Sequence, residues 1–200
     1  MKTLNFFCLL ACVIAALTGC ASSPSHFYTL DATAKNDNTT PVMCAVLVGP
    51  VFIPAAVERP QFVVTTTANE VRIEEFNRWA APLNENIARV LTLNLGRLLG
   101  TPRAATAPMP DFGPAYRVTL RIEQFDSVLG SGGKPGCIRL KAQWAIRSPD
   151  GKNLYSGGSD ASEPLKGDSR EAIAAAHSLA LSKVSCDIAA AIRGAESVKN

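Results

Sequence analysis

The residues whose types and order come closest to a catalytic site are Ser159, Asp168 and His177. Ser159 lies in a Gly-Gly-Ser-Asp-Ala run, close to the Gly-x-Ser-x-Gly turn that presents a hydrolase nucleophile, and Asp and His follow in the order of that triad. That turn needs a helix directly after the serine, whereas the Asp-Ala-Ser-Glu-Pro that follows predicts a loop. His177 falls on the apolar stripe of a predicted helix, which favours a buried histidine. We therefore expect no working triad.

Other residue types that carry chemistry are too few or badly spaced. Glu74 and Glu75 are neighbours on a predicted strand, so they point to opposite faces and are expected to be solvated or paired locally. The glycine-rich run at residues 130–136 lacks the Gly-Lys-Ser/Thr ending of a phosphate loop. The chain has 2 His, and no cysteines have metal-site spacing. The sequence thus indicates no catalytic residue, no metal and no cofactor.

The N-terminus reads as a secretory signal, with Lys2 followed by an apolar stretch over residues 4–17. The stretch is shorter than the roughly 20 residues of a transmembrane helix. The Leu-Thr-Gly-Cys at residues 17–20 resembles the lipobox of bacterial lipoproteins. This resemblance implies removal of residues 1–19, acylation of Cys20 and a tether over residues 20–26. An ordinary cleavage site with a chance cysteine is the alternative.

The two residues after Cys20 are Ala21 and Ser22 rather than the aspartate that retains lipoproteins in the inner membrane. The lipoprotein sorting pattern therefore implies the periplasmic face of the outer membrane. Three further cysteines would follow the signal in an oxidising compartment, namely Cys44, Cys137 and Cys186. At most one disulfide can form among them, and all three pairings stay open.

The rest of the chain alternates predicted strands and helices. Strands are expected over residues 27–30, 45–53 with a bend at Gly49-Pro50, 61–67 and 71–76 as a hairpin, 116–123, 138–147 and 153–156. Helices are expected over residues 82–99, ended by Gly100, and from a cap at Asp168 to Gly194. The proline-rich residues 101–114 read as a long connection. The pattern predicts one α/β domain over residues 27–196, with a mixed or mainly antiparallel sheet covered by two principal helices.

Charge is balanced, with a formal net charge of +3 and no long run, so no nucleic-acid partner is expected. The outward-pointing positions of two strands nevertheless carry cations, at Arg117, Arg121, Arg139, Lys141 and Arg147. These side chains form either an ordinary solvated face or a basic stripe for anionic headgroups or an acidic partner.

Two segments carry a resemblance to a known family: Glu-Arg-Pro-Gln-Phe-Val at residues 58–63 and Phe-Asn-Arg-Trp-Ala-Ala-Pro-Leu-Asn-Glu-Asn at residues 76–86. Together with the lipobox, they resemble the PqiC-type ABC-transport auxiliary lipoproteins, which are subunits of membrane-integrity-associated transporters. The resemblance implies a non-catalytic outer-membrane subunit of an envelope lipid-transport system. It also implies that this subunit associates into a homo-oligomer. Its partners would be a periplasm-spanning MCE-domain protein and inner-membrane transporter components.

The resemblance also suggests which residues would dock the partner: Arg59, Pro60, Gln61, Arg78 and Trp79. Trp79 has a competing interpretation, as an anchor that fixes the start of the first helix to the core. One alternative function is a lipid-anchored periplasmic protein that binds a small apolar ligand or stabilises another envelope assembly. An anchored hydrolase using Ser159 is a third. A deep apolar pocket would favour the ligand-binding function, and an exposed patch on a closed core would favour docking.

Overall fold

Three long antiparallel strands form one side of the sheet in the computed structural model, which describes residues 23–36, 39–130, 132 and 135–197. They are β6 (Tyr116–Val128), β7 (Cys137–Arg147) and β8 (Leu154–Pro164), paired in that order. Buried and exposed side chains alternate along β6 and β7, as the sequence predicts. The Gly-rich loop joining β6 to β7 makes this pair a hairpin.

The other edge of β6 is shared by two strands, so the sheet divides there. The start of β6 pairs in parallel with β2 (Val46–Phe52), and its end pairs with β3 (Gln61–Thr67) at Val128. Beyond β2 lies the short parallel strand β5 (Ala104–Thr106). Beyond β3 lie β4 (Glu70–Trp79), its antiparallel hairpin partner, and β1 (His26–Tyr28), parallel to β4. The result is the mixed 8-stranded sheet of one domain.

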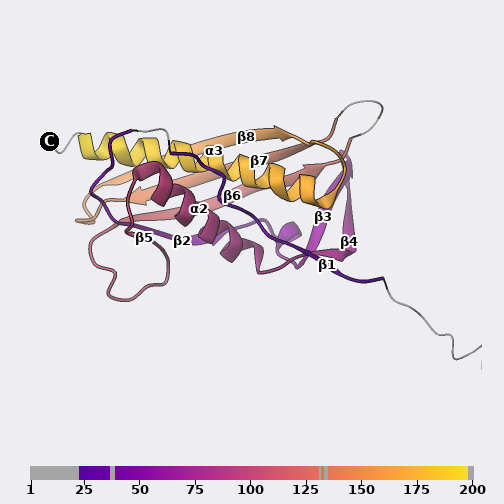
Figure 1. Cartoon of the computed structure of the whole chain (residues 1–200), viewed down its shortest axis with the longest axis horizontal. Helices are drawn as coiled ribbons and strands as arrows, with labels where there is room; N and C mark the ends of the chain where they lie inside the picture. Colours follow the sequence, from indigo (N-terminus) through magenta and orange to yellow (C-terminus); the bar gives the residue numbers. More distant parts are fainter. Residues whose placement is uncertain (1–22, 37–38, 131, 133–134, 198–200) are drawn as a thin grey trace, which may run out of the picture.

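Two helices cover one face of this sheet (Figure 1). The first, α2 (Leu83–Leu99), starts after Pro82 and ends at Gly100, whose φ of 65° is the left-handed conformation that glycine adopts readily. The second, α3 (Arg170–Ser197), packs on β7 and β8 and against α2. Their apolar faces and the inner side chains of the sheet form one core, which includes Phe62, Leu91 and Ile188.

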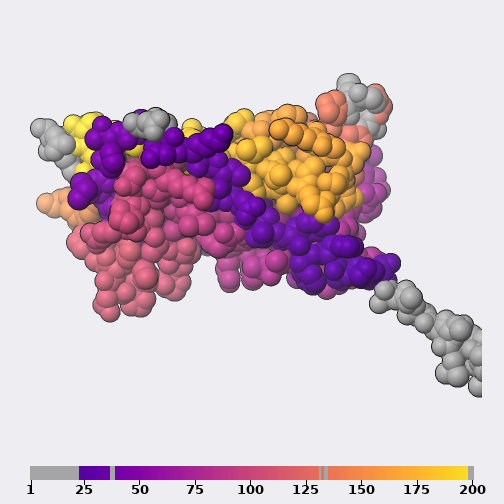
Figure 2. All heavy atoms as spheres, in the orientation of Figure 1, coloured from indigo at the N-terminus to yellow at the C-terminus, as the bar shows by residue number. Residues whose placement is uncertain are grey.

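A segment from the N-terminal part of the chain crosses the outside of both helices (Figures 1 and 2). This strap, residues 31–36 and 39–43, is held by hydrogen bonds to each helix. The backbone N–H of Asp31 donates to Ser178 Oγ of α3 at 3.0 Å, and that of Ala34 donates to Asn94 Oδ1 of α2, also at 3.0 Å. Farther along, Arg193 of α3 donates to the carbonyl oxygen of Thr40 at 2.6 Å.

Several sequence predictions of element boundaries are wrong. The strand predicted over residues 153–156 is the first part of β8, which continues to Pro164 through residues expected to form a loop. The predicted connection over residues 101–114 contains β5. Helix α3 runs past Gly194 to Ser197, and Ser169 rather than Asp168 caps it, since Ser169 Oγ accepts the backbone N–H of Ala172 at 3.2 Å.

The prediction that Glu74 is solvated or paired locally is also wrong. Val71 and Ile73 are exposed at 55% and 45%, whereas Glu74 is 8% exposed. The Glu74 carboxylate is neither solvated nor paired only with its neighbours: it receives two hydrogen bonds from the Arg170 guanidinium at the start of α3. The register places Glu74 opposite the buried Phe62, and the long-range ion pair, which sequence alternation does not reveal, compensates the charge of the buried carboxylate.

Candidate functional site

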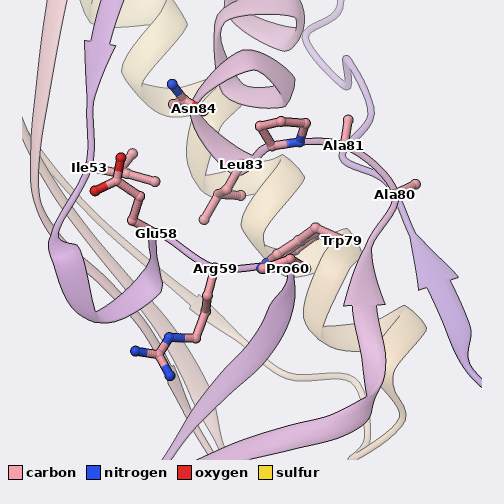
Figure 3. Close-up of a pocket in the computed structure, with 10 residues that line it drawn as sticks. Ile53, Glu58, Arg59, Pro60, Trp79, Ala80, Ala81, Leu83 and Asn84 are labelled. Atoms are coloured by element: carbon pink, nitrogen blue, oxygen red, sulfur yellow. The ribbon is translucent and has the colours of Figure 1, made fainter.

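A surface depression lies where the loop that precedes β3 faces the start of α2 (Figure 3). Its volume is about 390 Å³, and its lining includes Ile53, Glu58, Arg59, Pro60, Trp79, Leu83 and Asn84. Three of the five predicted docking residues, Arg59, Pro60 and Trp79, therefore meet at one place. We call this the α2 depression.

Backbone hydrogen bonds hold the two sides of the α2 depression together. The short helix η1 (Ala55–Val57) turns the chain after β2, and the N–H of Arg59 donates to the carbonyl oxygen of Val57 at 2.8 Å. The N–H of Trp79 donates to the carbonyl oxygen of Pro60 at 2.7 Å, and the N–H of Ala80 donates to that of Tyr28 at 2.8 Å. The shape of the depression is thus fixed by the main chain of three segments.

Trp79 belongs mainly to the core and contributes little surface to the depression. Its side chain is 6% exposed, and its ring packs against Phe62 at a centroid distance of 4.1 Å and against Phe125 at 6.4 Å. Contacts of this kind stabilise a fold through buried aromatic area. The anchoring role weighed for Trp79 from the sequence is the one its contacts support.

The side chains around the depression combine apolar walls with charged groups at the rim. Ile53 and Pro60 supply apolar surface above the buried Leu83. Figure 3 shows the Glu58 side chain directed towards Ile53 and the Arg59 side chain extending away from the start of α2. No side chain caps the start of α2, so its first backbone N–H groups give this wall partial positive charge. The arrangement suits an apolar side chain flanked by polar or charged groups.

The two other predicted docking residues lie apart from the α2 depression. Gln61 and Arg78 are register partners at the ends of β3 and β4. Arg78 Nη2 pairs with Glu75 Oε1 at 3.3 Å, and its Nε donates to the Glu75 carbonyl oxygen at 3.0 Å. Arg78 is adjacent in sequence to Trp79, but neighbouring strand residues point to opposite sides of the sheet. Gln61 and Arg78 therefore form a second, separate pair.

A second depression, absent from the sequence predictions, lies on the other side of the start of α2. Its volume is about 560 Å³, and its lining includes Gly49, Pro50, Asn86, Arg89, Thr106 and Pro108. It shares Ala81 and Asn84 with the α2 depression, so the first turn of the helix forms a ridge between the two. The Gly-Pro bend in β2 and the prolines after β5 were the sequence signals nearest to it.

Ser159 and His177, two residues of the rejected triad, form hydrogen bonds with other residues rather than with each other. Ser159 lies on β8, where its hydroxyl donates to Asp187 Oδ2 at 2.6 Å and accepts from Trp144 Nε1 at 3.2 Å. His177 is fully buried, and its Nε2 lies 2.9 Å from Ser127 Oγ.

Among the residues that the structure describes, no cluster of His, Cys, Asp or Glu could hold a metal ion. No disulfide joins Cys44, Cys137 and Cys186, all of which are described.

The predicted basic stripe lies on the sheet face opposite the helices. Arg117 and Arg147 are direct register partners on β6 and β7, and both are exposed. Arg121 stacks over the Phe52 ring at 5.0 Å, and Lys141 pairs with Asp160 at 3.3 Å. The charge of Lys141 is therefore neutralised locally, and the clearest concentration of charge in the stripe is the Arg117 and Arg147 pair.

The predicted signal and Cys20 lie outside the described residues. In the part of the chain from 23 to 197 that is described, no helix is long and apolar enough to cross a membrane.

Comparisons with known proteins give one family and one fold. The model of the ABC-type transport auxiliary lipoprotein component family matches residues 28–189. The crystal structure of XCC0632 from Xanthomonas campestris superposes with a TM-score of 0.70 at 16% identity, covering 88% of this chain and 100% of that one. An uncharacterized protein of known structure gives 0.67 at 18% identity, covering 85% of this chain and 99% of that one. No curated protein matches the sequence significantly.

Proposed function

This chain belongs to the family of ABC-type transport auxiliary lipoprotein components, and from that membership we propose that it is a non-catalytic outer-membrane subunit of an envelope lipid-transport system. Acylation of Cys20 would hold it at the periplasmic face of the outer membrane. Its partners would be a periplasm-spanning MCE-domain protein and, through it, the inner-membrane components of the transporter. Two or more acyl chains on one cysteine give the stable anchoring that a single chain does not.

The α2 depression is the observation that carries the docking part of the proposal. It is preformed by main-chain hydrogen bonds, it combines apolar walls with a charged rim, and it contains the exposed Arg59. Interfaces of this composition take an apolar anchor residue and use polar groups around it for orientation. Gln61 and Arg78 are retained as docking candidates on the neighbouring sheet surface, separate from the depression.

Crosslinking in intact envelopes tests the partner. The full-length protein is crosslinked, extracted in detergent and captured by affinity, and bound proteins are identified by mass spectrometry. We expect an MCE-domain protein whose recovery requires Cys20, so that Cys20→Ala abolishes it. Efficient crosslinking to other proteins without an MCE-domain partner would overturn the transport function.

Charge reversal at the depression tests the docking surface. Arg59→Glu is expected to lower recovery of the partner by roughly tenfold, which corresponds to the loss of one well-placed charged contact. Arg103→Glu is the matched control, because Arg103 is also an exposed arginine but lies outside the lining of the depression. Equal recovery with both variants would remove the α2 depression as the docking site.

Association into a homo-oligomer forms part of the proposal. The outer edge of β8 has no strand partner among the described strands, and an open edge can pair with another chain. Light scattering of the acylated protein in detergent would give the mass, and a monomeric mass at micromolar concentration would remove this part.

Binding of a small apolar ligand is the second candidate function. The volume of the α2 depression, about 390 Å³, falls within the usual range for ligand pockets. Native mass spectrometry of protein purified from envelopes would detect a retained small molecule. Such a ligand, together with failure to recover a partner, would move this function to first place. A lipid-anchored hydrolase is the third candidate function. It would be eliminated if the Ser159→Ala variant kept every activity of the original protein.

A further inference from the structure

The exposed apolar side chains of β1 and β4 lie next to the point where the N-terminal tether joins the domain. We propose that these residues, Phe27, Val71, Ile73 and Phe76, contact the surface of the bilayer that holds the anchor, and we call them the β4 strip. The occupant is a lipid surface, recognised through apolar contact rather than through charge. This inference rests on the acylation of Cys20 in the proposed function.

The length of the tether keeps this end of the domain close to the membrane. Cys20 and His26 are six positions apart. Six residues reach roughly 20 Å even when fully extended. The first strand residue, His26, lies beside Asn77 of β4, so β4 shares the restriction. A short tether therefore holds β1 and β4 against or near the headgroup region whatever the rest of the domain does.

The β4 strip consists of large apolar side chains that are exposed. Phe27 is 64% exposed, Val71 55%, Ile73 45% and Phe76 41%. β1 pairs with β4 only at Asn77–Trp79, so β4 has no outer neighbour over residues 70–76 among the described strands. Open strand edges with apolar side chains are usually covered or blunted by charge in soluble proteins.

The register places most of these side chains on one face. Val71 pairs with Thr65 and Ile73 with Val63, while the buried Phe62 and Val64 point to the helices, so Val71 and Ile73 lie on the helix-free face. Phe27 pairs with Arg78, whereas its neighbour Tyr28 pairs with the buried Trp79, so Phe27 faces the same way. Aromatic and other large apolar side chains gathered on one face are found in protein surfaces that lie at the membrane interface.

The charges around the strip balance. Glu70, Arg72, Glu75 and Arg78 are the exposed or half-buried charges of β4, and Arg78 is paired with Glu75. The buried Glu74 of the same strand is balanced by Arg170. A surface with no net charge gains little from anionic lipid. The exposed Arg117 and Arg147 pair lies at the start of β6, whereas Val71 aligns through Thr65 with Val128 at the end of β6. Strand length separates these ends by roughly 35 Å.

Photocrosslinking to lipid tests the proposal on the acylated, full mature protein in phosphatidylcholine vesicles that contain a photoactivatable phosphatidylcholine. We expect lipid adducts on the peptides that contain Phe27 and residues 71–76. Adding phosphatidylglycerol is expected to leave their yield unchanged. The mass of the N-terminal peptide reports acylation in the same samples.

The double variant Phe27→Asp with Ile73→Asp is expected to lower the adduct yield by roughly tenfold, because charged groups oppose apolar insertion. Leu154→Asp is the control, since Leu154 is 59% exposed but pairs with Arg147 at the far end of the sheet. Unchanged thermal unfolding midpoints would show that all the variants are folded.

The inference would be overturned if acylated protein gave the same yield of lipid adducts at Leu154 as at the β4 strip. It would also be overturned if the double variant left the adduct yield unchanged. Adducts that require anionic lipid would also overturn it. A protein crosslinked to the strip in envelopes in place of lipid would assign the surface to another occupant and have the same effect. These outcomes are independent of partner capture at Arg59, so the two proposals fail separately.

Discussion

The imidazole ring of His177 lies flat against the phenyl ring of Phe125, with centroids 3.9 Å apart and planes inclined by 6°. His177 Nε2 is 2.9 Å from Ser127 Oγ, and Nδ1 has no hydrogen-bond partner. Burial lowers the pKa of His177 from 6.5 to about 3, because the charged ring would lose its solvation. The histidine is thus a neutral component of the core that joins α3 to β6.

Acid is expected to weaken the fold through His177. Because the pKa of the folded state lies below that of the unfolded state, the unfolded chain binds the extra proton, and stability falls as pH drops from about 6.5 towards about 3. The free energy of unfolding should fall by about 1 kcal/mol per pH unit in this window. Urea unfolding between pH 7 and pH 5 measures the slope.

A substitution at the other histidine of the chain serves as the control for the change in the free energy of unfolding between pH 7 and pH 5. His177→Gln should reduce this change, whereas His26→Gln, at an exposed histidine, should leave it as in the original protein. An undiminished slope in His177→Gln would assign the pH dependence to other groups.

The ion pair between Glu74 and Arg170 is expected to contribute strongly to stability. Burial raises the pKa of Glu74, but hydrogen bonds and charge from Arg170, aided by Arg72, outweigh this effect and lower it overall. Glu74→Gln should cost about 3 kcal/mol, since it leaves the largely buried guanidinium unpaired. Glu75→Gln, at an exposed neighbour, should cost less than about 1 kcal/mol. Guanidinium chloride unfolding at pH 7 compares them.

The same pair has a pH signature distinct from that of His177. A lowered carboxylate pKa stabilises the fold above the unfolded value of 4.5, and this stability is lost as pH falls further. Subtracting the Glu74→Gln curve from that of the original protein should therefore show a difference that shrinks below about pH 4.5. A constant difference down to pH 3 would contradict the assignment.

Gly157 is expected to be intolerant of a side chain. A Cβ there would lie 2.4 Å from Trp144 on the adjacent strand, whereas a Cβ on Gly158 would approach nothing nearer than 3.7 Å. Gly157→Ala should therefore cost about 2 kcal/mol, and Gly158→Ala should be near neutral. Thermal unfolding of both variants checks this. Equal stability would mean that Trp144 can move aside.

Asn94 is expected to hold the strap to the helices. Its side chain is fully buried, accepts the Ala34 N–H at 3.0 Å and donates to Ser185 Oγ at 3.2 Å. Asn94→Ala should cost about 2 kcal/mol because it leaves buried polar groups unsatisfied. Asn84→Ala, at the partly exposed start of the same helix, should cost less than about 1 kcal/mol. Hydrogen exchange at the Ala34 amide would report the local release.

Sequence patterns predicted those elements whose periodicity reflects a single buried face. Alternation located β6 and β7, and the spacing of Leu83, Ile87 and Leu91 located α2. Most of β8 was missed because its Gly, Ser and Pro content has low strand propensity, and only pairing with β7 and cover from α3 make it a strand. Tertiary contacts overrode local preference there.

Sequence reasoning named only some of the residues that line the α2 depression, for a similar reason. Arg59, Pro60 and Trp79 come together because main-chain bonds join the two segments that carry them. Arg78 was grouped with them through the resemblance of the segment it shares with Trp79, but strand geometry turns it away. The second depression was missed because Gly49 and Thr106 meet only through the parallel pairing of β2 with β5.

The strap has a mechanical meaning for a protein held at its N-terminus. A pull along the tether would load β1 first, which is attached to β4 over Asn77–Trp79 alone. The strap lies directly after β1 and is bonded to α3 at Ser178 and to α2 at Asn94. If tension separates β1 from β4, the force is transmitted through the strap to α3 and α2. The two helices, rather than the strands of the sheet, would then bear the load from the anchor.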